Sequence, residues 1–364
     1  MAFFAMSCND SSNEHSSTTM AKADSAVTEI KDSIIDKTNG NKPDWAPTID
    51  SDMWEVIQKL ESFHDRPIPE LTAAEARKNH TPTDAVMALI QEKNIFLPPS
   101  KADTTGKEIP VKGGNIHVRI YTPKEGKAPY PVIVYYHGGG FVIADLDVYH
   151  ASAQALSEQT EAVVVSVAYR LSPEHKFPTA HNDAYAAYEW TVRHASSIKG
   201  DPKRVAVAGE SAGGNLAINV SIKARDNKFT LPVHQLLVYP VANNDMNTES
   251  YVKNEHAKPL DKEMMKWFVK NYLVNEKESS DPRISVVNAR LNGLPETTII
   301  TAEIDPLQSE GMLLRDKLEK VGVKVYSKNY NGVTHEFFGM AALVSDAKDA
   351  QEFAADKLKS AFKK

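Results

Sequence analysis

Six short apolar runs separated by amphipathic stretches constrain the fold of this chain more than any other feature of its sequence. Runs this short and this rich in β-branched and aromatic residues predict strands, and the stretches between them have helical spacing. Strands alternating with helices predict an α/β fold, in which helices cover both faces of a mostly parallel sheet. The runs are PVIVYYH (131–137), AVVVSVAY (162–169), RVAVA (204–208), HQLLVY (234–239), TTIITA (297–302) and KVYSKNY (324–330).

Three parts of the 364-residue chain differ in composition. Residues 1–45 are rich in Ser, Thr, Asn, Asp and Lys, which predicts a disordered tether or the remnant of a signal segment. Residues 46–100 carry apolar side chains at helical spacing, interrupted by prolines up to Pro82, and predict short amphipathic helices. Residues 101–364 hold the strands, and an insertion at 251–273 predicts an extra helical segment that packs with the N-terminal helices over the sheet.

The composition excludes several classes of function. The 48 acidic and 42 basic residues give a net charge of -6 without any basic block, so we expect no nucleic-acid partner. A single cysteine, Cys8, excludes internal disulfides and cysteine-based metal clusters. No apolar run approaches the roughly 18 residues that are needed to span a bilayer. A hydrophobic content of 41% is sufficient for the buried core of an enzyme.

The first eight residues, MAFFAMSC, leave two localisations open. They resemble the end of a bacterial lipoprotein signal, in which an apolar stretch leads to a cysteine that becomes acylated. The stretch before Cys8 is short for such a signal and has no basic residue. We therefore expect either a cell-envelope lipoprotein with a lipid anchor at Cys8, if the true start lies upstream, or a cytoplasmic protein with a free cysteine.

The segment RVAVAGESAGGNLA (204–217) places Ser211 in the sequence context of a nucleophile. An apolar strand precedes Gly-Glu-Ser-Ala-Gly and a helix follows it, as the nucleophile-elbow motif G-x-S-x-G requires. In so tight a turn, a Cβ at Gly209 or Gly213 is expected to meet the neighbouring strand or helix. A glycine-rich helix start with a serine cap is the alternative, and the flanking strand and helix favour the nucleophile.

A serine hydroxyl needs a base to take its proton and a carboxylate to orient that base. In chains with this elbow the order is serine, then the acid, then histidine. Three histidines follow Ser211: His234 begins a strand, His256 lies in a polar run, and His335 lies in the loop after the last predicted strand. His335 is the best candidate, since a loop residue there can reach another strand end.

The orienting acid is expected after the strand that precedes the last one. Asp305 follows the buried run TTIITA within TTIITAEIDPLQSEG, and an acid there suits a histidine beyond the last strand. Glu303, nearer the end of the run, is the less favoured substitute. The sequence therefore predicts Ser211, Asp305 and His335 as a catalytic triad.

Three consecutive glycines follow His137 in the segment HGGGF, at the end of a predicted central strand. Glycines leave backbone N–H groups uncovered, and these donors can point at the oxygen that becomes negative when the serine attacks. A phosphate-binding glycine loop is the alternative, but the sequence contains neither G-x-x-x-x-G-K-[ST] nor G-x-G-x-x-G.

From about residue 50 to its end, the chain resembles the bacterial hormone-sensitive-lipase family of carboxylesterases, which are α/β-hydrolases. The motifs that carry the resemblance are YYHGGGF, YRLSPEHKFP, GESAGGNL, DPLQSEG and GVTHEFF. The resemblance implies Ser211 as nucleophile, His335 as base and Asp305 as its orienting acid, without a metal or cofactor. It also implies that the backbone N–H groups of three residues form the oxyanion hole, namely Gly139, Gly140 and Ala212.

The resemblance also implies a domain organisation. Residues 46–100 would form the N-terminal part of a helical cap, residues 251–273 the rest of it, and residues 101–364 the catalytic domain. Two residues depart from the family pattern: Glu210 replaces the usual aspartate or threonine, and Glu336 stands where glycine is common. We expect these changes to alter substrate preference or the pKa of His335, because neither removes a reacting group.

The predicted function is hydrolysis of short- to medium-chain acyl esters through an acyl-enzyme, by a monomer or homodimer that acts on a small-molecule ester. Activity is expected to fall as the pH drops through roughly 6 to 7, because His335 must be neutral to act as a base. An amidase, lactonase or deacetylase would use the same triad. A non-catalytic ligand receptor of the same fold is disfavoured by His335, which related receptors have lost. A lipase of long-chain fats is disfavoured by the closed helical cap.

Overall fold

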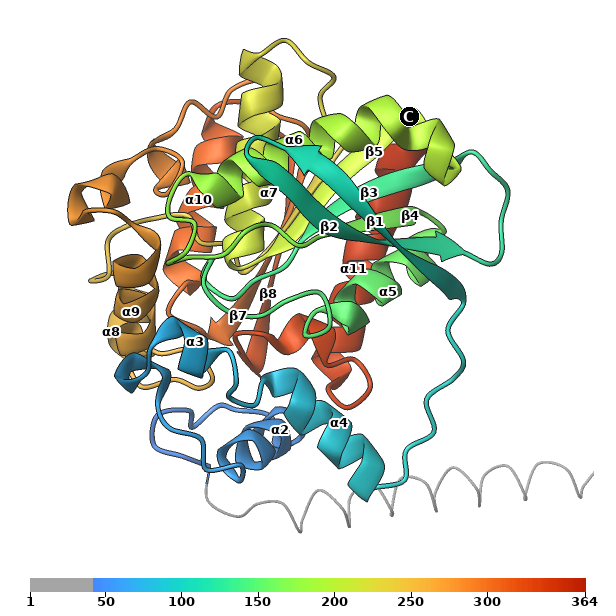
Figure 1. Ribbon diagram of the computed structural model, residues 1–364. Helices are drawn as coiled ribbons and strands as arrows, with labels where there is room; N and C mark the ends of the chain where they lie inside the picture. The colour runs from blue at the N-terminus through green and yellow to red at the C-terminus, as the bar shows by residue number, and fades with distance from the viewer. Residues whose placement is uncertain (1–41) are drawn as a thin grey trace, which may run out of the picture. The chain divides into compact units, whose positions relative to one another are not determined.

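An eight-stranded sheet runs through the described part of the chain (Figure 1). The computed structural model describes residues 42–364, so Cys8 and nearly all of the predicted tether lie outside the described residues. The strand order is β1-β2-β4-β3-β5-β6-β7-β8. The strands are β1 (Ala102–Val111), β2 (Gly114–Pro123), β3 (Tyr130–Tyr136), β4 (Val163–Val167), β5 (Gly200–Glu210), β6 (Gln235–Val238), β7 (Thr297–Ile304) and β8 (Val325–Thr334).

The sheet is mostly parallel, as the sequence predicts. The strands β3 to β8 run parallel to one another, whereas β2 is antiparallel to both β1 and β4. Alternate residues of β3 point to opposite faces, so that Val132 and Val134 enter one core and Ile133 and Tyr135 enter the other. Both faces of the sheet are therefore buried, which explains why the strands read as continuous apolar runs.

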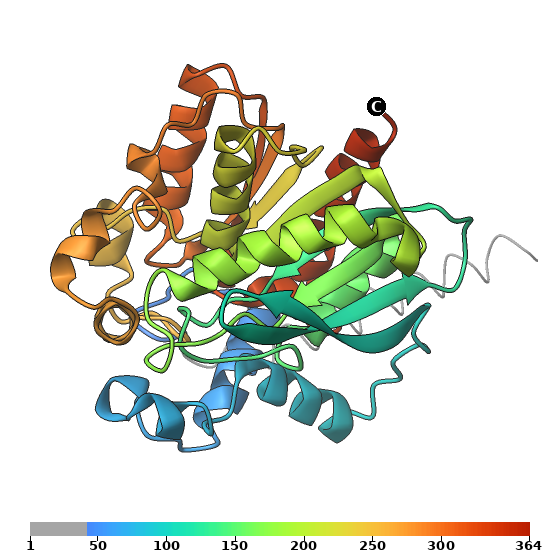
Figure 2. The same cartoon turned by 45° about the horizontal axis from the view of Figure 1, so that its top comes forward.

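Helices cover each face of the sheet (Figure 2). The apolar side chains of α5 and α11 pack into one core, and those of α6, α7 and α10 pack into the other. The predicted α/β class is thereby confirmed. These five helices are α5 (His150–Thr160), α6 (Thr179–His194), α7 (Ala212–Asp226), α10 (Gln308–Lys320) and α11 (Ser345–Phe362).

The N-terminal segment forms short helices, with local capping at two of them. Thr72 and Thr81 each begin a helix with a reciprocal capping box, to Glu75 and Asp84 respectively. The predicted break at Pro82 coincides with the first residue of α4, where the missing N–H of proline costs nothing. The elements are α2 (Ser51–Glu61), η1 (Ile68–Glu70), α3 (Ala73–Ala76) and α4 (Pro82–Glu92).

The first helix of this segment is joined to the last strand of the sheet and to the last helix. The N–H of Asp50 donates to the carbonyl of Gly332 at 2.8 Å, and the N–H of Ser345 donates to the Asp52 carboxylate at 3.0 Å. The apolar face of α2, which includes Met53 and Ile57, is fully buried in the same core as α11. Residues at both ends of the folded unit therefore form one core.

The insertion after β6 is helical and contacts the N-terminal segment. It contains α8 (Glu249–Lys253) and α9 (Lys262–Tyr272), and the indole N–H of Trp267 in α9 donates to the carbonyl of Leu71 at 2.9 Å. Figure 1 shows these helices gathered with α2, α3 and α4 beyond the carboxyl ends of β7 and β8. The remaining short elements are η2 (Ala195–Ile198), η3 (Glu276–Ser280), η4 (Val286–Asn288) and η5 (Phe337–Gly339).

Candidate active site

Ser211 occupies the turn between β5 and α7 with a strained backbone. Its φ of 54° and ψ of −117° are unfavourable for a residue with a Cβ, at a cost of about 1–3 kcal/mol. Two hydrogen bonds hold the turn: the N–H of Ser211 donates to Val238 at 2.9 Å, and its carbonyl accepts from Val241 at 3.1 Å. The segment around β6 thus keeps the serine in this conformation.

The two glycines of the motif are required by close backbone contacts. A Cβ built on Gly209 would lie 2.1 Å from the carbonyl oxygen of Gly213, and one built on Gly213 would lie 1.9 Å from that of Tyr136. Both distances are far below any real contact of a Cβ atom. The expectation that neither position tolerates a side chain is confirmed.

His335 and Asp305 meet at the ends of two neighbouring strands. Asp305 is the first residue after β7, and His335 is the first after β8. The Nδ1 atom of His335 lies 2.7 Å from Oδ2 of Asp305, and the N–H of Leu307 donates to Oδ1 of Asp305 at 2.8 Å. Both side chains are buried. The carboxylate is therefore fixed from two sides, and it fixes the imidazole in turn.

The environment of His335 favours its protonated form. Burial acts to lower the pKa of the imidazole, but the charge and hydrogen bond of Asp305, with the charges of Glu336 and Glu210, outweigh burial and raise it above its ordinary value. A raised pKa makes the imidazole a stronger base in its neutral form.

The other candidates from the sequence make different contacts. Glu303 accepts a hydrogen bond from the N–H of Gly332 at 2.9 Å and lies within 3.3 Å of Lys253. His234 is buried, with Nε2 2.8 Å from Thr298 Oγ1, and His256 is exposed. None of the three lines the pocket described below that contains Ser211.

The glycine loop after β3 lies beside Ser211, since a Cβ built on Gly138 would lie 3.2 Å from the Cβ of the serine. Gly139 and Gly140 have φ values of 89° and 58°, and both line the same pocket as the serine. A Cβ on Gly140 would lie 2.2 Å from the ring of Phe268, so the loop passes directly beneath α9. Within residues 42–364, the N–H groups of Gly139 and Gly140 donate to no backbone carbonyl.

Two carboxyl groups lie beside the histidine, one buried and one partly exposed to the cavity. Glu210 is fully buried and accepts hydrogen bonds from the hydroxyls of Tyr135 and Tyr239. Burial, reinforced by the charge of Glu336, raises the pKa of Glu210 to about 7. Glu336 accepts from the Tyr149 hydroxyl at 2.6 and 2.7 Å, and its Oε1 lies 3.8 Å from Nε2 of His335. Burial raises the pKa of Glu336 as well.

Sequence reasoning noted Glu210 and Glu336 only as departures from a pattern, and it missed their tyrosine partners. Tyr149 precedes α5, and Tyr239 follows β6 with its ring 4.5 Å from that of His335. No local motif marks either tyrosine, since only the folded sheet brings these segments together. An available signal was the pair of acidic residues adjacent to Ser211 and His335, which predicts that buried donors are needed.

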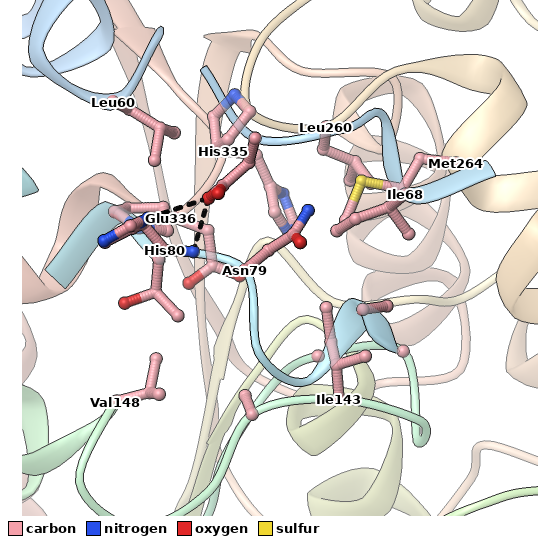
Figure 3. Close-up of a pocket in the computed structure, with 18 of the residues that line it drawn as sticks. Leu60, Ile68, Asn79, His80, Ile143, Val148, Leu260, Met264, His335 and Glu336 are labelled. Atoms are coloured by element: carbon pink, nitrogen blue, oxygen red, sulfur yellow. Dashed lines mark hydrogen bonds and ion pairs between the residues drawn. The ribbon is translucent and has the colours of Figure 1, made fainter. Parts of the chain in front are cut away.

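A cavity of about 800 Å³ opens above these groups. Ser211, Gly139, Gly140, His335 and Glu336 form part of its wall, and the N-terminal helices and the insertion form the remainder. Figure 3 shows Leu60 and Ile68 from the N-terminal segment and Leu260 and Met264 from the insertion around the same space as His335 and Glu336. The segments predicted to form a cap therefore contribute apolar side chains to the cavity.

The described residues hold neither a cluster of metal-ligating side chains nor a helix suited to a membrane. Residues 42–364 contain no group of three or more His, Cys, Asp or Glu side chains that could hold a metal ion. In the same part of the chain, no helix combines the length and the apolar character that crossing a membrane requires.

Comparison with known families gives a match over the central part of the chain. Residues 133–339 match the model of the alpha/beta hydrolase fold family. A carboxylesterase of Mycobacterium tuberculosis is 37% identical over 240 residues, which are 65% of this chain and 75% of that protein. An ethyl acetate hydrolase of Pseudomonas putida is 30% identical over 298 residues, which are 80% of this chain and 91% of that protein.

Solved structures give the same result. The esterase of the archaeon Pyrobaculum calidifontis superposes with a TM-score of 0.76 at 35% identity, covering 83% of this chain and 96% of the esterase. A thermostable esterase of Pseudomonas putida superposes with a TM-score of 0.79 at 33% identity, covering 87% of this chain and 98% of that protein.

Proposed function

The chain belongs to the alpha/beta hydrolase fold family, among its hormone-sensitive-lipase-like carboxylesterases, and we propose that it hydrolyses carboxylic esters with Ser211 as the nucleophile. Two observations carry the proposal: His335 contacts Asp305, and His335 lines the same cavity as Ser211. A histidine held by a carboxylate can act as a base only on the side of its second nitrogen. The esterases among the relatives and structural neighbours support an ester as the substrate.

The first half of the proposed reaction acylates the serine. His335 takes the proton of the Ser211 hydroxyl at Nε2 while the oxygen attacks the ester carbonyl, which gives a tetrahedral intermediate. Asp305 stabilises the imidazolium that forms. The histidine then gives the proton to the alcohol oxygen, the bond between that oxygen and the carbonyl carbon breaks, and the alcohol leaves.

The second half of the reaction releases the acid. His335 takes a proton from a water molecule, whose oxygen attacks the acyl carbon, and the bond to Ser211 breaks as the serine oxygen regains a proton from the imidazolium. In both halves the N–H groups of Gly139, Gly140 and Ala212 bind the negative oxygen. Removing one such donor typically lowers the rate by about 100-fold to 1000-fold.

We further propose that the N-terminal helices and the insertion act as a cap that limits the acyl chain to short or medium length. Apolar side chains from both segments line the cavity, and the indole of Trp267 joins the segments to each other. A cavity of about 800 Å³ lies within the range of ordinary small-ligand sites. Hydrolysis rates along a ladder of 4-nitrophenyl esters of increasing acyl length test the limit directly.

Labelling with a serine-directed reagent tests the proposed function. Phenylmethanesulfonyl fluoride should add one sulfonyl group per chain on Ser211 and abolish turnover of 4-nitrophenyl acetate. The Ser211→Ala variant should take up no label and should have no turnover. Labelling at a different serine, or full turnover in the variant, would contradict the assignment, and a non-catalytic receptor would hydrolyse no ester at all.

A matched pair of substrates distinguishes ester hydrolysis from amide hydrolysis by the same residues. The rates on 4-nitrophenyl acetate and 4-nitroacetanilide, which share both their acyl group and their aromatic ring, give the preference of the enzyme for ester over amide. We expect the ratio of the ester rate to the amide rate to be larger with the enzyme than in alkaline solution without it.

A further inference from the structure

We propose that Glu336 makes this site selective for the charge of the alcohol portion of the ester, favouring a positively charged alcohol and disfavouring a negatively charged one. This inference rests on the proposed function, because it needs the alcohol to leave beside His335. It adds a specificity-determining residue and a class of substrate, esters of amino or quaternary ammonium alcohols.

The position of Glu336 relative to the histidine gives the geometric basis. Its Oε1 atom lies 3.8 Å from Nε2 of His335, and that nitrogen is the one that must return a proton to the leaving alcohol. A hydrogen bond from Nε2 places the alcohol oxygen within about 3 Å of the nitrogen, and so within about 7 Å of the Glu336 carboxylate. A charge carried a few bonds from that oxygen therefore lies close to the carboxylate.

The carboxylate of Glu336 is held in place but only partly compensated. The Tyr149 hydroxyl donates to both of its oxygens, at 2.6 and 2.7 Å, and fixes the carboxylate against the wall of the cavity. A carboxylate accepts about four hydrogen bonds, and the described part of the chain places no Lys or Arg in an ion pair with this one. The side chain is one-fifth exposed, and that exposed part faces the cavity.

The other charged groups near the reacting atoms do not neutralise the negative charge of Glu336. When the alcohol leaves, the positive charge of the His335 imidazolium is matched by Asp305, and the tetrahedral oxygen is itself negative. Glu210 lies behind the cavity wall and does not line it. The region around the leaving alcohol is therefore negative as a whole, so a cationic alcohol is stabilised there and an anionic one is repelled.

The charges elsewhere in the cavity do not reverse this balance. Of the lysine and the arginine in its lining, Arg77 is bonded to Glu174, and Lys258 is exposed at the rim. Two histidines also line the cavity, and one of them is bonded to Asp65. The remaining acidic side chains of the lining are Glu61, Asp65, Asp145 and Asp261.

Three acetate esters of similar size measure the selectivity. Acetylcholine carries a positive charge on its alcohol portion, 3,3-dimethylbutyl acetate is its uncharged counterpart, and 2-acetoxyethanesulfonate carries a negative charge. At low ionic strength, we expect kcat/KM of the wild-type enzyme for the cationic ester to be at least about tenfold higher than for the anionic ester. Equal values for the two charged esters would overturn the proposal without any variant.

The Glu336→Gln variant assigns the selectivity to one residue. The ratio of kcat/KM for acetylcholine to that for 3,3-dimethylbutyl acetate should fall at least about threefold relative to wild type, because glutamine keeps the shape and removes the charge. Taking the ratio between enzymes cancels the intrinsic reactivity of the esters. A smaller fall in a variant that retains the wild-type circular dichroism spectrum would overturn the proposal.

A matched control removes the same charge from the rim of the cavity. Glu61 lines the cavity but is exposed, so Glu61→Gln should change the same ratio by less than about twofold, since water screens its charge. If the ratio falls equally in both variants, the selectivity comes from the summed charge of the cavity. That result would overturn the role of Glu336. Absence of hydrolysis of the neutral ester by wild type would instead contradict the proposed function itself.

Discussion

The imidazole of His335 and the carboxylate of Asp305 lie 2.7 Å apart although 30 positions separate the two residues in the chain. Each residue is the first after a strand, and β7 and β8 are parallel neighbours in the sheet. Parallel pairing alone therefore brings the two side chains together at one edge. A shift in the pairing of these strands would separate the two side chains.

Replacing Asp305 with asparagine should lower kcat by about 10³-fold to 10⁴-fold, because the histidine loses both its orientation and the charge that stabilises its protonated form. The measurement is kcat on 4-nitrophenyl acetate. Glu303→Gln is the matched control, since Glu303 accepts from the N–H of Gly332 instead and lies only two residues away. A larger loss in the Glu303 variant than in the Asp305 variant would reverse the assignment of the acid.

The pH dependence of kcat/KM should show one acid limb, caused by His335. Only the neutral imidazole can take the serine proton, so activity is lost as the pH falls through the pKa of His335. Since Asp305 and Glu336 raise that pKa, we expect the midpoint above the ordinary value of about 6.5. Glu336→Gln should move the midpoint to lower pH, because one of the raising charges is removed. A midpoint well below 6.5 in wild type would contradict the described environment.

A methyl group at Gly213 should destabilise the protein more than the same change at the next residue. In Gly213→Ala the new Cβ meets the carbonyl oxygen of Tyr136 at 1.9 Å, and the strand backbone has no room to yield. In Gly214→Ala the overlap is milder, because the new Cβ lies 2.9 Å from Cβ and 3.1 Å from Cα of Pro240. We expect losses of about 3 kcal/mol or more and about 1 kcal/mol respectively, measured by urea unfolding. Equal stability of the two variants would contradict the tight turn.

Arg77 should be required for the stability of the cap. Its guanidinium donates to the carbonyl of Val142, just beyond the glycine loop, at 2.8 Å, to that of Ser172, after β4, at 2.7 Å, and to the Glu174 carboxylate. Arg77→Met leaves both carbonyls without this donor, and we expect a loss of about 1–3 kcal/mol in the free energy of unfolding together with a raised KM.

A second arginine in the same segment provides the control for that change. Arg66 is exposed and contacts the carbonyl of Glu70 only at 3.3 Å. Arg66→Met should therefore change the free energy of unfolding by less than about 0.5 kcal/mol. If the two variants lose the same stability, the bonds from Arg77 to the loop carbonyls contribute nothing specific.

The sequence predicts most of the sheet and the elements around the reacting groups, for a physical reason. Strands buried on both faces must be apolar throughout, so their runs stand out, and a strained turn tolerates only glycine at Gly209 and Gly213. Chain order then leaves few histidines and acids to choose from. Each of these signals is carried by residues that are neighbours in the chain, so it can be read without knowing the fold.

The surroundings of the histidine could not be predicted in the same way. The hydroxyls that hold Glu210 and Glu336 come from Tyr135, Tyr149 and Tyr239, which belong to three separate segments of the chain. Their meeting depends on the order of strands in the sheet and on the start of α5. Strand order is a property of the whole fold, and no short motif encodes it.

The bond between Asp50 and Gly332 has a consequence for biosynthesis. A ribosome adding about 5–20 residues per second completes the helix Ser51–Glu61 tens of seconds before it reaches the strand on which that helix rests. During this interval the apolar side chains of Met53, Val56 and Ile57 lack the part of their core that β8 and α11 supply. Part of the apolar face of this helix therefore stays exposed on the nascent chain until the C-terminal helix has emerged.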